Sequence, residues 1–564
     1  MHPRVRLPGL VEPLWERAER DPDALSIVFT SEDGERREIT AGMLRDSVAR
    51  AAAGLAGRGV GAGDVVLIAV GHSRELIDAI LGSLALGAVP AVAPYFTGRL
   101  DPDVYARRVE SMVAGARARL VMISDELAER VGGVLTESTC STVSAQSLAA
   151  CGGVFPVADV ADDDLAYLQF TSGSTGTQKA VAHTQRAMRE YLRVKAAVDA
   201  YRTDDVIVSW LPLYHDMGFV SGLLAPLRTG IPVVLMSPVH WVRDPKILLR
   251  AIHDYRGTVT WMPNFALTHC VRGVRERDVE GLDLTSWRQL VIGAEPIRVE
   301  SVRAFAERFA PHGFDPSVFR MGYGMAENVE GICVTSLGEA LPVDWISRTD
   351  LQRAGCARPV SEDAADATAV VSCGRPMAGT ELRVVDEDGN QLGDRTIGEI
   401  VVRGPYCMSG GYYQRPDLTE QSFRDSWFLT GDLGYLVDRS LYVCGRRKDL
   451  IIVGGHNVHP SDVEVVAGEH PAVAAGRVVA FGVRDDRVGT ERLVVACELR
   501  EPADELRRRE IEREIRERVV RTLDVALSEL RFVDRGWIVK TSSGKLARTA
   551  NRDRHLLETE RPDA

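Results

Sequence analysis

Short apolar runs alternate with amphipathic stretches through the first third of the chain. Each run is followed by a stretch in which apolar residues recur at helical spacing. Short, continuous apolar runs are typical of strands buried on both faces, and this alternation predicts βαβ units around a mainly parallel sheet. The expected strand and helix pairs are Val65–Val70 with Arg74–Leu86, Val89–Val92 with Val104–Ala114, and Leu120–Ser124 with Glu126–Leu135.

The strand-like runs resume later, and the pattern then changes. Further strands are expected at Val206–Trp210, Val233–Met236 and Leu290–Ile292. Beyond Gly374 the segments are shorter, with an Asp388-Gly389-Asn390 turn between apolar alternations that is typical of a hairpin. The strands expected there are Glu381–Val385, Gly398–Arg403 and Leu441–Cys444. We therefore expect a small β-rich, barrel-like subdomain over about residues 374–447.

The end of the chain has a pattern of its own. Val478–Val483 and Leu493–Leu499 are strand-like, and Asp504–Thr522 predicts a highly charged helix. Alternating Arg and Glu on that helix indicate a solvated face with i,i+4 pairs, or else a docking face for a carrier protein. The predicted class is α/β: residues 1–447 form a large domain of two βαβ-type subdomains plus the β-rich one, and residues 448–564 form a small α+β domain.

Composition limits the functions that need to be considered. The chain has 564 residues, which is too long for one simple core, and a net charge of −12 argues against nucleic acid or an anionic membrane as the main partner. Glycines and prolines interrupt the most apolar stretch, Ala79–Phe96, so no membrane span is expected. Met1–Leu10 has no apolar core of a secretory signal, and the nine cysteines form no CxxC pair. A reducing cytoplasm is the expected location.

A loop rich in Ser, Thr and Gly follows the strand-like run Leu165–Phe170. It reads Thr171-Ser172-Gly173-Ser174-Thr175-Gly176-Thr177-Gln178-Lys179. Backbone N–H groups and hydroxyls in such a loop can hold a phosphate, with the lysine adding charge. It is not a Walker A loop, because Gln178 precedes Lys179 and Ala180 follows it. Taken alone, the pattern fits a surface turn equally well.

Six further motifs accompany this loop in a fixed order along nearly the whole chain. They are Leu211-Pro212-Leu213-Tyr214-His215-Asp216-Met217-Gly218, Gly293-Ala294-Glu295-Pro296, Gly322-Tyr323-Gly324-Met325-Ala326-Glu327, Thr430-Gly431-Asp432, Gly445-Arg446-Arg447-Lys448-Asp449 and Lys540-Thr541-Ser542-Ser543-Gly544-Lys545. Together with the loop they resemble the signature of the adenylate-forming superfamily. That superfamily contains acyl-CoA synthetases, fatty acyl-AMP ligases, peptide-synthetase adenylation domains and luciferases.

The resemblance implies an ATP site with Mg²⁺. The phosphate loop with Lys179 would hold the β- and γ-phosphates, and Glu327 would bind the metal. Tyr323 would stack on adenine, and Asp432 and Arg446 would face the ribose. The remaining residues implied to line the nucleotide slot are Gly293, Ala294, Glu295, Gly324, Met325 and Ala326.

The resemblance also implies catalytic roles. Lys545 would reach the substrate carboxylate and the α-phosphate, with Glu327 contributing through the metal, and His215 would lie where the acid enters. Lys448 would be the hinge about which the small domain rotates between half-reactions, bringing the Gly454-Gly455-His456-Asn457 loop forward for thioester formation. Each of these residues, taken singly, also has an ordinary structural explanation.

The acid pocket is the part that the sequence describes least. Its expected walls are apolar or aromatic, although any one of these side chains could equally belong to the core. The candidates are Trp210, Met217, Phe219, Trp261, Phe265 and His269.

Three stretches resemble the fatty acyl-AMP ligase branch of the superfamily. They are Pro263-Asn264-Phe265-Ala266, the Gly-Met-Ala-Glu motif that ends at Glu327, and Val371-Ser372-Cys373-Gly374-Arg375-Pro376. The extra segment of about Leu341–Ala369 resembles the insertion that hinders the rotation needed for CoA transfer. Two motifs depart from that branch: Gly455-His456-Asn457-Val458-His459-Pro460, and Gln178-Lys179-Ala180 in the phosphate loop.

The resemblance implies an acid–thiol ligase. We expect it to activate an apolar, fatty-acid-like or specialised-metabolite carboxylic acid as acyl-AMP, with release of pyrophosphate. The acyl group would then pass to the phosphopantetheine thiol of a carrier protein, or alternatively to free CoA. An ADP-forming phosphotransferase and a non-catalytic acyl- or nucleotide-binding protein are the rival hypotheses.

Overall fold

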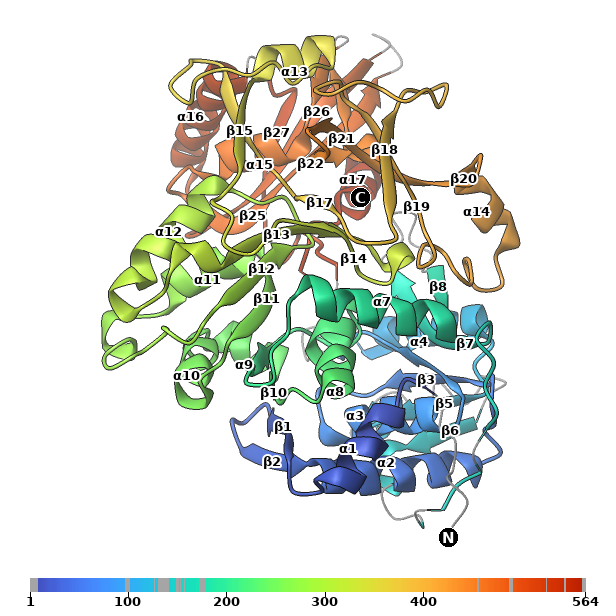
Figure 1. Ribbon diagram of the computed structural model, residues 1–564. Coiled ribbons are helices and arrows are strands. Elements are labelled where there is room, and N and C mark those ends of the chain that lie inside the picture. Colours follow the sequence, from blue (N-terminus) through green and yellow to red (C-terminus); the bar gives the residue numbers. More distant parts are fainter. Residues whose placement is uncertain are drawn as a thin grey trace.

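The computed structural model describes residues 9–96, 102–125, 127–129, 141–148, 152, 154–156, 158–171, 179–453, 456–485, 490–523, 525–541 and 544–559 (Figure 1). Three predicted segments lie wholly or largely outside these residues. They are the helix expected at Glu126–Leu135, the phosphate-loop residues Ser172, Gly173, Ser174, Thr175 and Gly176, and Gly454 with Gly455 of the C-terminal loop.

The first large sheet has six strands. In spatial order they are β6 (Ser141–Ser144), β5 (Leu120–Ile123), β3 (Val65–Ala69), β4 (Val89–Val92), β7 (Leu165–Thr171) and β8 (Lys179–Thr184). All neighbours are parallel except β7 and β8, which pair antiparallel. Its helices are α2 (Ala41–Ala56), α3 (Arg74–Ala85), α4 (Pro102–Ala116) and α6 (Ala145–Leu148). Every residue of β3, β4 and β5 is buried, as expected for strands covered on both faces.

The second large sheet has nine strands. Their order is β17 (Arg375–Pro376), β14 (Gly331–Val334), β13 (Phe319–Gly324), β12 (Gln289–Gly293), β11 (Val259–Pro263), β9 (Ile207–Ser209), β10 (Val233–Met236), β1 (Leu25–Thr30) and β2 (Arg36–Thr40). The run from β13 to β1 is parallel, and β2, β14 and β17 are antiparallel edge additions. The associated helices are α1 (Glu12–Arg20), α7 (Gln185–Val198), α8 (Ala225–Thr229), α9 (Pro238–Arg243), α10 (Lys246–Tyr255), α11 (Asn264–Gly273) and α12 (Val299–Phe309), with a π-helix at Met217–Leu224.

Side-chain caps fix where several helices begin. The hydroxyl of Ser73 accepts a hydrogen bond from the Leu76 N–H at 3.2 Å at the start of α3. Thr184 does the same for the Ala187 N–H at 3.3 Å, so α7 begins directly after β8. Such caps satisfy N–H groups that have no partner within the helix. The cap at Thr184 therefore fixes the start of α7 at the end of β8, the second strand of the phosphate-loop hairpin.

The β-rich part is antiparallel, as the hairpin pattern predicts. A five-stranded sheet contains β18 (Glu381–Val385), β19 (Gly398–Arg403), β20 (Phe423–Arg424), β21 (Trp427–Val437) and β22 (Ser440–Arg446), with α14 (Pro416–Gln421) beside it. The predicted insertion folds as a separate antiparallel pair, β15 (Val343–Ser347) and β16 (Ala367–Val371), joined through α13 (Arg348–Ala354). Ile346 and Leu351 of this insertion pack in one cluster with Tyr435 of β21.

The C-terminal part is a small α+β unit reached through the turn Arg447–Asp449. It contains the pair β23 (Ile451–Val453) and β24 (His456–Val458), and a sheet of β25 (Val473–Asp485), β26 (Thr490–Leu499) and β27 (Glu529–Val533). Its helices are α15 (Pro460–Gly468), α16 (Glu505–Leu523) and α17 (Arg548–Thr559). On α16 the residues Ile511, Ile515, Val519 and Leu523 are buried, while Arg and Glu pairs occupy the outer face, as the charge pattern predicts.

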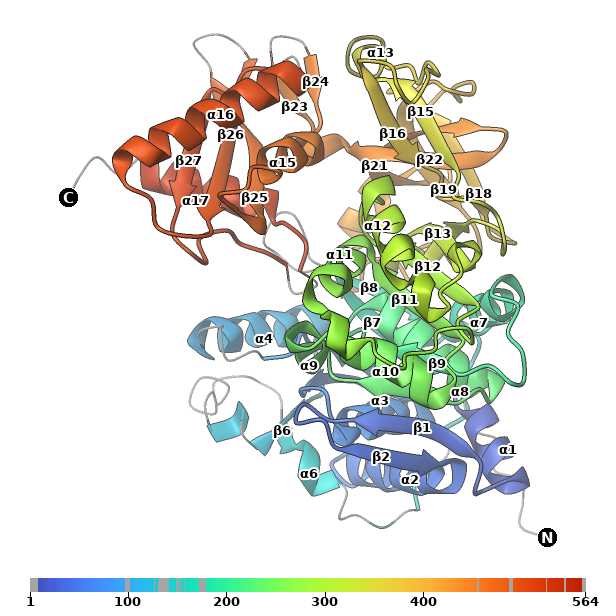
Figure 2. The same cartoon turned by 90° about the vertical axis from the view of Figure 1, so that its left-hand side faces the viewer.

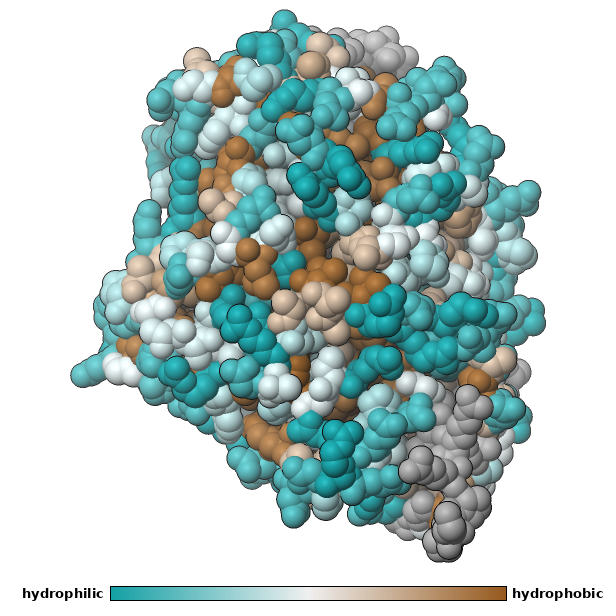
Figure 3. Space-filling view, viewed as in Figure 1, coloured by the Kyte–Doolittle hydropathy of each residue, from teal (hydrophilic) through white to brown (hydrophobic). Residues whose placement is uncertain are grey.

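The parts are stacked, with the first sheet at the end of the molecule opposite the β-rich part (Figure 1). Figure 2 shows the C-terminal unit standing beside the β-rich part, with α15 and β25 facing the middle of the molecule. Apolar side chains gather across the middle of the face seen in Figure 3, where the upper and lower parts meet. The predicted α/β class, with a small C-terminal α+β unit, is confirmed. Within the described residues, no helix has the length and apolar character needed to cross a membrane.

Candidate active site

One large cleft takes its walls from both large sheets, the β-rich part and the C-terminal unit. Its volume is about 2020 Å³. Motifs that are hundreds of residues apart meet in it because the strand ends of the large domain and the loop before α17 face the same space. The predicted site residues that line it are Thr171, Lys179, His215, Gly293, Ala294, Glu295, Tyr323, Gly324, Met325, Ala326, Glu327, Asp432, Arg446, Lys448 and Lys545.

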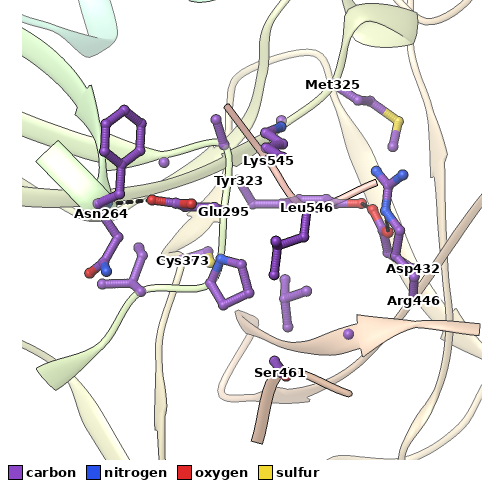
Figure 4. A pocket seen from close by; sticks show the side chains of 18 of the residues that line it. Asn264, Glu295, Tyr323, Met325, Cys373, Asp432, Arg446, Ser461, Lys545 and Leu546 are labelled. Carbon is purple, nitrogen blue, oxygen red and sulfur yellow. Dashed lines mark hydrogen bonds and ion pairs between the residues drawn. The ribbon is translucent and has the colours of Figure 1, made fainter. Parts of the chain in front are cut away.

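Tyr323, Asp432 and Arg446 form a connected row along one wall (Figure 4). The Tyr323 hydroxyl donates to Asp432 Oδ2 at 2.7 Å, and Arg446 Nε lies 2.9 Å from Asp432 Oδ1. Asp432 and Arg446 are directly paired between β21 and β22. The Asp432 carboxylate raises the pKa of the Arg446 guanidinium, although burial opposes this. Since a carboxylate can accept about four hydrogen bonds, Asp432 is held in one orientation with acceptor capacity left for a ligand hydroxyl.

The ends of the phosphate loop lie side by side. Thr171 and Lys179 are directly paired between β7 and β8, so the loop closes a β-hairpin. Lys179 Nζ lies 4.7 Å from the centroid of the Tyr412 ring, and the Tyr412 hydroxyl donates to Glu327 Oε1 at 2.9 Å. Burial raises the pKa of Glu327. One tyrosine therefore positions both a cation and a carboxylate at this end of the cleft.

Lys545 extends from the C-terminal unit into the cleft (Figure 4). Its backbone is fixed by Thr541, whose N–H donates to the Lys545 carbonyl at 2.7 Å and whose hydroxyl accepts from the Lys545 N–H at 3.1 Å. Burial lowers the pKa of Lys545, and the charge of Asp216 opposes that shift. An ammonium group withdrawn from water in this way is ready to interact with an anionic ligand.

His215 and Asp216 precede the π-helix that begins at Met217. His215 Nδ1 lies 2.5 Å from Asp216 Oδ1, and the Met217 N–H donates to the same oxygen at 2.7 Å. Burial would raise the pKa of Asp216, but His215, the Met217 N–H and Lys545 together lower it. The cleft thus holds an ionised carboxylate whose charge acts on Lys545.

The glycine motifs allow a close approach of the backbone. A Cβ added to Gly324 would lie 2.0 Å from the Glu330 carbonyl oxygen, so no other residue fits there without a backbone shift. Glu295 has a local structural partner, because its carboxylate accepts a hydrogen bond from the Phe265 N–H at the start of α11 (Figure 4). Burial raises the pKa of Glu295.

Two of the proposed acid-pocket residues lie elsewhere. Trp210 is stacked on Trp241 with ring centroids 3.6 Å apart, and Phe219 is stacked on Tyr167 at 3.9 Å. Both belong to the main core and neither lines the cleft. Their partners are buried aromatic rings, so packing accounts for them. The other four candidates, Met217, Trp261, Phe265 and His269, do line the cleft.

Several cleft residues were not anticipated as functional. Asp216 follows His215 in the same motif, and an acidic side chain at that position could have marked it as a candidate. Tyr412 is 85 residues from its partner Glu327, and nothing local marks it. The buried charged residues Lys195, Asp199 and Glu330 also line the cleft. Lys195 and Asp199 are an i,i+4 pair at the end of α7 that the sequence spacing could have indicated, whereas only the fold brings Glu330 to them.

The described residues contain no group of three or more His, Cys, Asp or Glu side chains arranged to hold a metal. Mg²⁺ is commonly bound by one or two carboxylates together with substrate phosphates. Glu327, held at the phosphate-loop end of the cleft, is a donor of that kind.

Comparisons with known proteins agree with this geometry. The AMP-binding enzyme family model matches residues 14–413. The medium-chain-fatty-acid–[acyl-carrier-protein] ligase JamA of Moorena producens is 32% identical over 91% of this chain and 89% of its own. The long-chain-fatty-acid–AMP ligase FadD26 of Mycobacterium marinum is 31% identical over 87% of each chain. A solved structure from work on fatty acyl-adenylate ligases of E. coli and L. pneumophila superimposes with a TM-score of 0.90, at 28% identity, over 99% of each chain.

Proposed function

The chain belongs to the AMP-binding enzyme family, and on that premise we propose that it activates an apolar carboxylic acid as acyl-AMP and passes the acyl group to a thiol. It is an adenylate-forming ligase, as its relatives are. The observation that carries the proposal is the meeting of Lys545, the His215–Asp216 pair and the Tyr323–Asp432–Arg446 row in one cleft. These residues come from three separate parts of the fold.

The residues of the cleft divide between the two ends of ATP. We assign the Tyr323 ring to adenine and Asp432 to the ribose hydroxyls, because Asp432 is fixed and retains acceptor capacity. Lys179 and Lys448 bring positive charge to the phosphate side, and the pKa of Lys448 is lowered first by burial and then by Arg446. Cations gathered in this way attract and orient an anion.

In the first step a carboxylate oxygen of the acid attacks the α-phosphorus. A new O–P bond forms, the bond to the β-phosphate oxygen breaks, and pyrophosphate leaves with the electron pair. We assign Lys545 to the charge that develops between the two anions, since its ammonium already faces the anionic part of the cleft. We assign Mg²⁺ to Glu327, where the ion would offset the repulsion between phosphate oxygens.

In the second step a thiolate attacks the acyl carbonyl and AMP leaves. We favour the phosphopantetheine thiol of a carrier protein as acceptor, because JamA is named as a ligase for an acyl-carrier protein and FadD26 as an AMP ligase. The insertion supports this choice: α13 packs against β24, and Arg348 donates to the Thr522 carbonyl of the C-terminal unit. Free CoA is the alternative acceptor.

The test is to identify products by mass after incubation with ATP, Mg²⁺ and a panel of carboxylic acids, with and without CoA. Acid-dependent acyl-AMP that persists with CoA present is the expected result. Formation of acyl-CoA would support the ligase assignment but would identify free CoA, and not a carrier protein, as the acyl acceptor. Absence of AMP and pyrophosphate with every acid would contradict the proposal and favour a non-catalytic binding protein.

A further inference from the structure

Three buried charged side chains line the inner part of the cleft. The side chains of Lys195, Asp199 and Glu330 are 6%, 5% and 7% exposed. Lys195 Nζ lies 3.0 Å from Asp199 Oδ2 and 3.4 Å from Glu330 Oε2. Arg320 Nη1 lies 3.3 Å from the other oxygen of Asp199. Because burying charges costs free energy even when they are paired, such a cluster on a cavity wall calls for a reason beyond packing.

The carboxylates of this cluster have partners but keep acceptor capacity. Glu330 Oε1 accepts from the Ser221 hydroxyl. Glu330 Oε2 and Asp199 Oδ2 both face the Lys195 ammonium, and the Tyr201 hydroxyl is a second partner of Asp199. Burial raises the pKa of Glu330 to about 7. Since a carboxylate can accept about four hydrogen bonds, Glu330 and Asp199 on the wall of the cavity can each receive a further donor from a ligand.

An apolar passage separates this cluster from the reacting centre. Lys195 Nζ lies 4.9 Å from the centroid of the Trp261 ring, and Trp261, Met217 and Val198 all line the same cleft. Ser221, which holds Glu330, stands on the π-helix that begins directly after Asp216. Ser221 is five positions after Asp216, which is about one turn of a helix with i→i+5 hydrogen bonds. The passage from the His215–Asp216 pair to the charged cluster is therefore short.

We infer that Lys195, Asp199 and Glu330 form the far end of the acid pocket and receive a hydrogen-bond donor, a hydroxyl or neutral amino group, carried by a short acid with an apolar body. This inference rests on the proposed function and specifies its substrate class. A long alkyl chain would have to bury its apolar end against these charges, which costs free energy. An acid whose hydroxyl or amino group reaches the cluster can instead donate a hydrogen bond to Glu330 or Asp199.

The first test compares matched acids on the wild-type protein. Hexanoic acid and its terminal hydroxy analogue form one pair, and phenylpropanoic acid and its para-hydroxy analogue form another, with dodecanoic acid as the long apolar reference. Acid-dependent exchange between ATP and labelled pyrophosphate gives kcat/KM for each acid. The hydroxy member of at least one pair should exceed its unsubstituted partner by about tenfold to a hundredfold, because a site built for a hydroxyl discriminates against its absence. It should also exceed dodecanoic acid.

The second test changes the cluster while conserving its net charge. Lys195→Met together with Glu330→Gln removes one positive and one negative group of similar shape, and it should reduce the preference for the hydroxy acid at least tenfold. The control is Arg74→Met with Asp78→Asn, which removes a partly buried ion pair, 2.9 Å apart, from α3, where neither residue lines the cleft. The control should leave the ratio of the two acids unchanged.

The outcomes separate this inference from the proposal on which it rests. If wild-type protein adenylates dodecanoic or hexanoic acid better than both hydroxy acids, the inference is overturned and the ligase assignment stands. If none of the acids supports exchange, both the inference and the proposed function are overturned. If the double variant fails to fold, the wild-type comparison alone decides the matter.

Discussion

Lys545 is the residue on which the proposed chemistry depends most directly. It reaches the cleft from the C-terminal unit, and its charge lies within the influence of Asp216, Glu295 and Asp432. Replacing it should therefore affect the step in which two anions are brought together, and not the thiol step.

Lys545→Ala should lower acid-dependent ATP–pyrophosphate exchange by about a hundredfold or more, because one preorganised cation is removed from the transition state. Thioester formation from supplied acyl-AMP should be retained. Arg535→Ala is the matched control: this arginine belongs to the same C-terminal unit, is exposed and does not line the cleft. It should cause a much smaller loss. Equal losses in the two variants would contradict the role of Lys545.

The pH dependence of adenylation should report the same group. Burial lowers the pKa of Lys545, so in the free enzyme its positive charge disappears as the pH rises through that lowered value. Since kcat/KM reflects ionisation of the free enzyme, it should fall on the alkaline side below the usual lysine pKa. In Lys545→Arg the residual activity should lose this alkaline limb, because guanidinium stays protonated. An unchanged limb in that variant would assign it to another group.

Residue identities in the site could be predicted wherever a local motif marked them. His215, Tyr323, Asp432 and Lys545 stand in quoted motifs and line the cleft. Trp210 and Phe219 could not be separated from cavity residues, because an apolar side chain looks the same in sequence whether it faces a cavity or another ring. Glu330 and its partner Ser221 are 109 residues apart, so only the folded chain reveals their contact.

At the scale of elements, Arg548 links the loop of Lys545 to the turn between the two parts of the chain. It stands at the start of α17, with Nη1 2.9 Å from Asp449 Oδ2 and Nε and Nη2 each 2.8 Å from the Glu464 carboxylate. The contacting side chains are mostly buried. This bidentate pair fixes α17, and hence Lys545, relative to Asp449.

Arg548→Ala should lower the free energy of unfolding by about 2–4 kcal/mol, because Glu464 and Asp449 are left as buried carboxylates without their partner. Urea denaturation measures this change. Arg552→Ala is the control on the same helix, where the side chain is 41% exposed and pairs with its neighbour Asp553. If both variants lower the free energy of unfolding by less than about 0.5 kcal/mol, the contacts of Arg548 with Asp449 and Glu464 do not stabilise the fold.

The insertion of β15, α13 and β16 should restrict the C-terminal unit. Arg348→Ala removes the hydrogen bond to the Thr522 carbonyl, a loss of about 1 kcal/mol that should shift the balance between orientations about fivefold. The ratio of CoA ligation to adenylation should rise accordingly. Arg424→Ala, on β20, is the control. An unchanged ratio of CoA ligation to adenylation in a folded Arg348→Ala variant would show that the insertion does not restrict the C-terminal unit.

Several strands could be predicted, because a continuous apolar run indicates a buried parallel strand and apolar alternation on either side of a turn indicates a hairpin. β4, β10, β18 and β19 have the bounds expected from the pattern. The antiparallel pairing of β8 with β7 was not foreseen, since the run after the phosphate loop carries polar residues at Lys179, His183 and Thr184. The length of β25 was underestimated because a register shift between Val473 and Val478 interrupts its apolar alternation.

At the scale of the whole molecule, the site exists only because three parts of the chain converge. The large sheets supply Asp216 and Tyr323, the β-rich part supplies Asp432, and the C-terminal unit supplies Lys545. A hinge near Lys448 would allow the C-terminal unit, with Lys545, to leave the cleft and return to it. We propose this rotation between the two half-reactions.

The most direct test of the central claim follows the oxygen of the acid. An acid with a heavy-oxygen carboxylate is incubated with ATP, Mg²⁺ and a thiol acceptor, and the nucleotide and phosphate products are analysed by mass. Attack of the carboxylate on the α-phosphorus predicts heavy oxygen in AMP and unlabelled pyrophosphate. Heavy oxygen in inorganic phosphate with formation of ADP would contradict adenylation and identify a phosphotransferase instead.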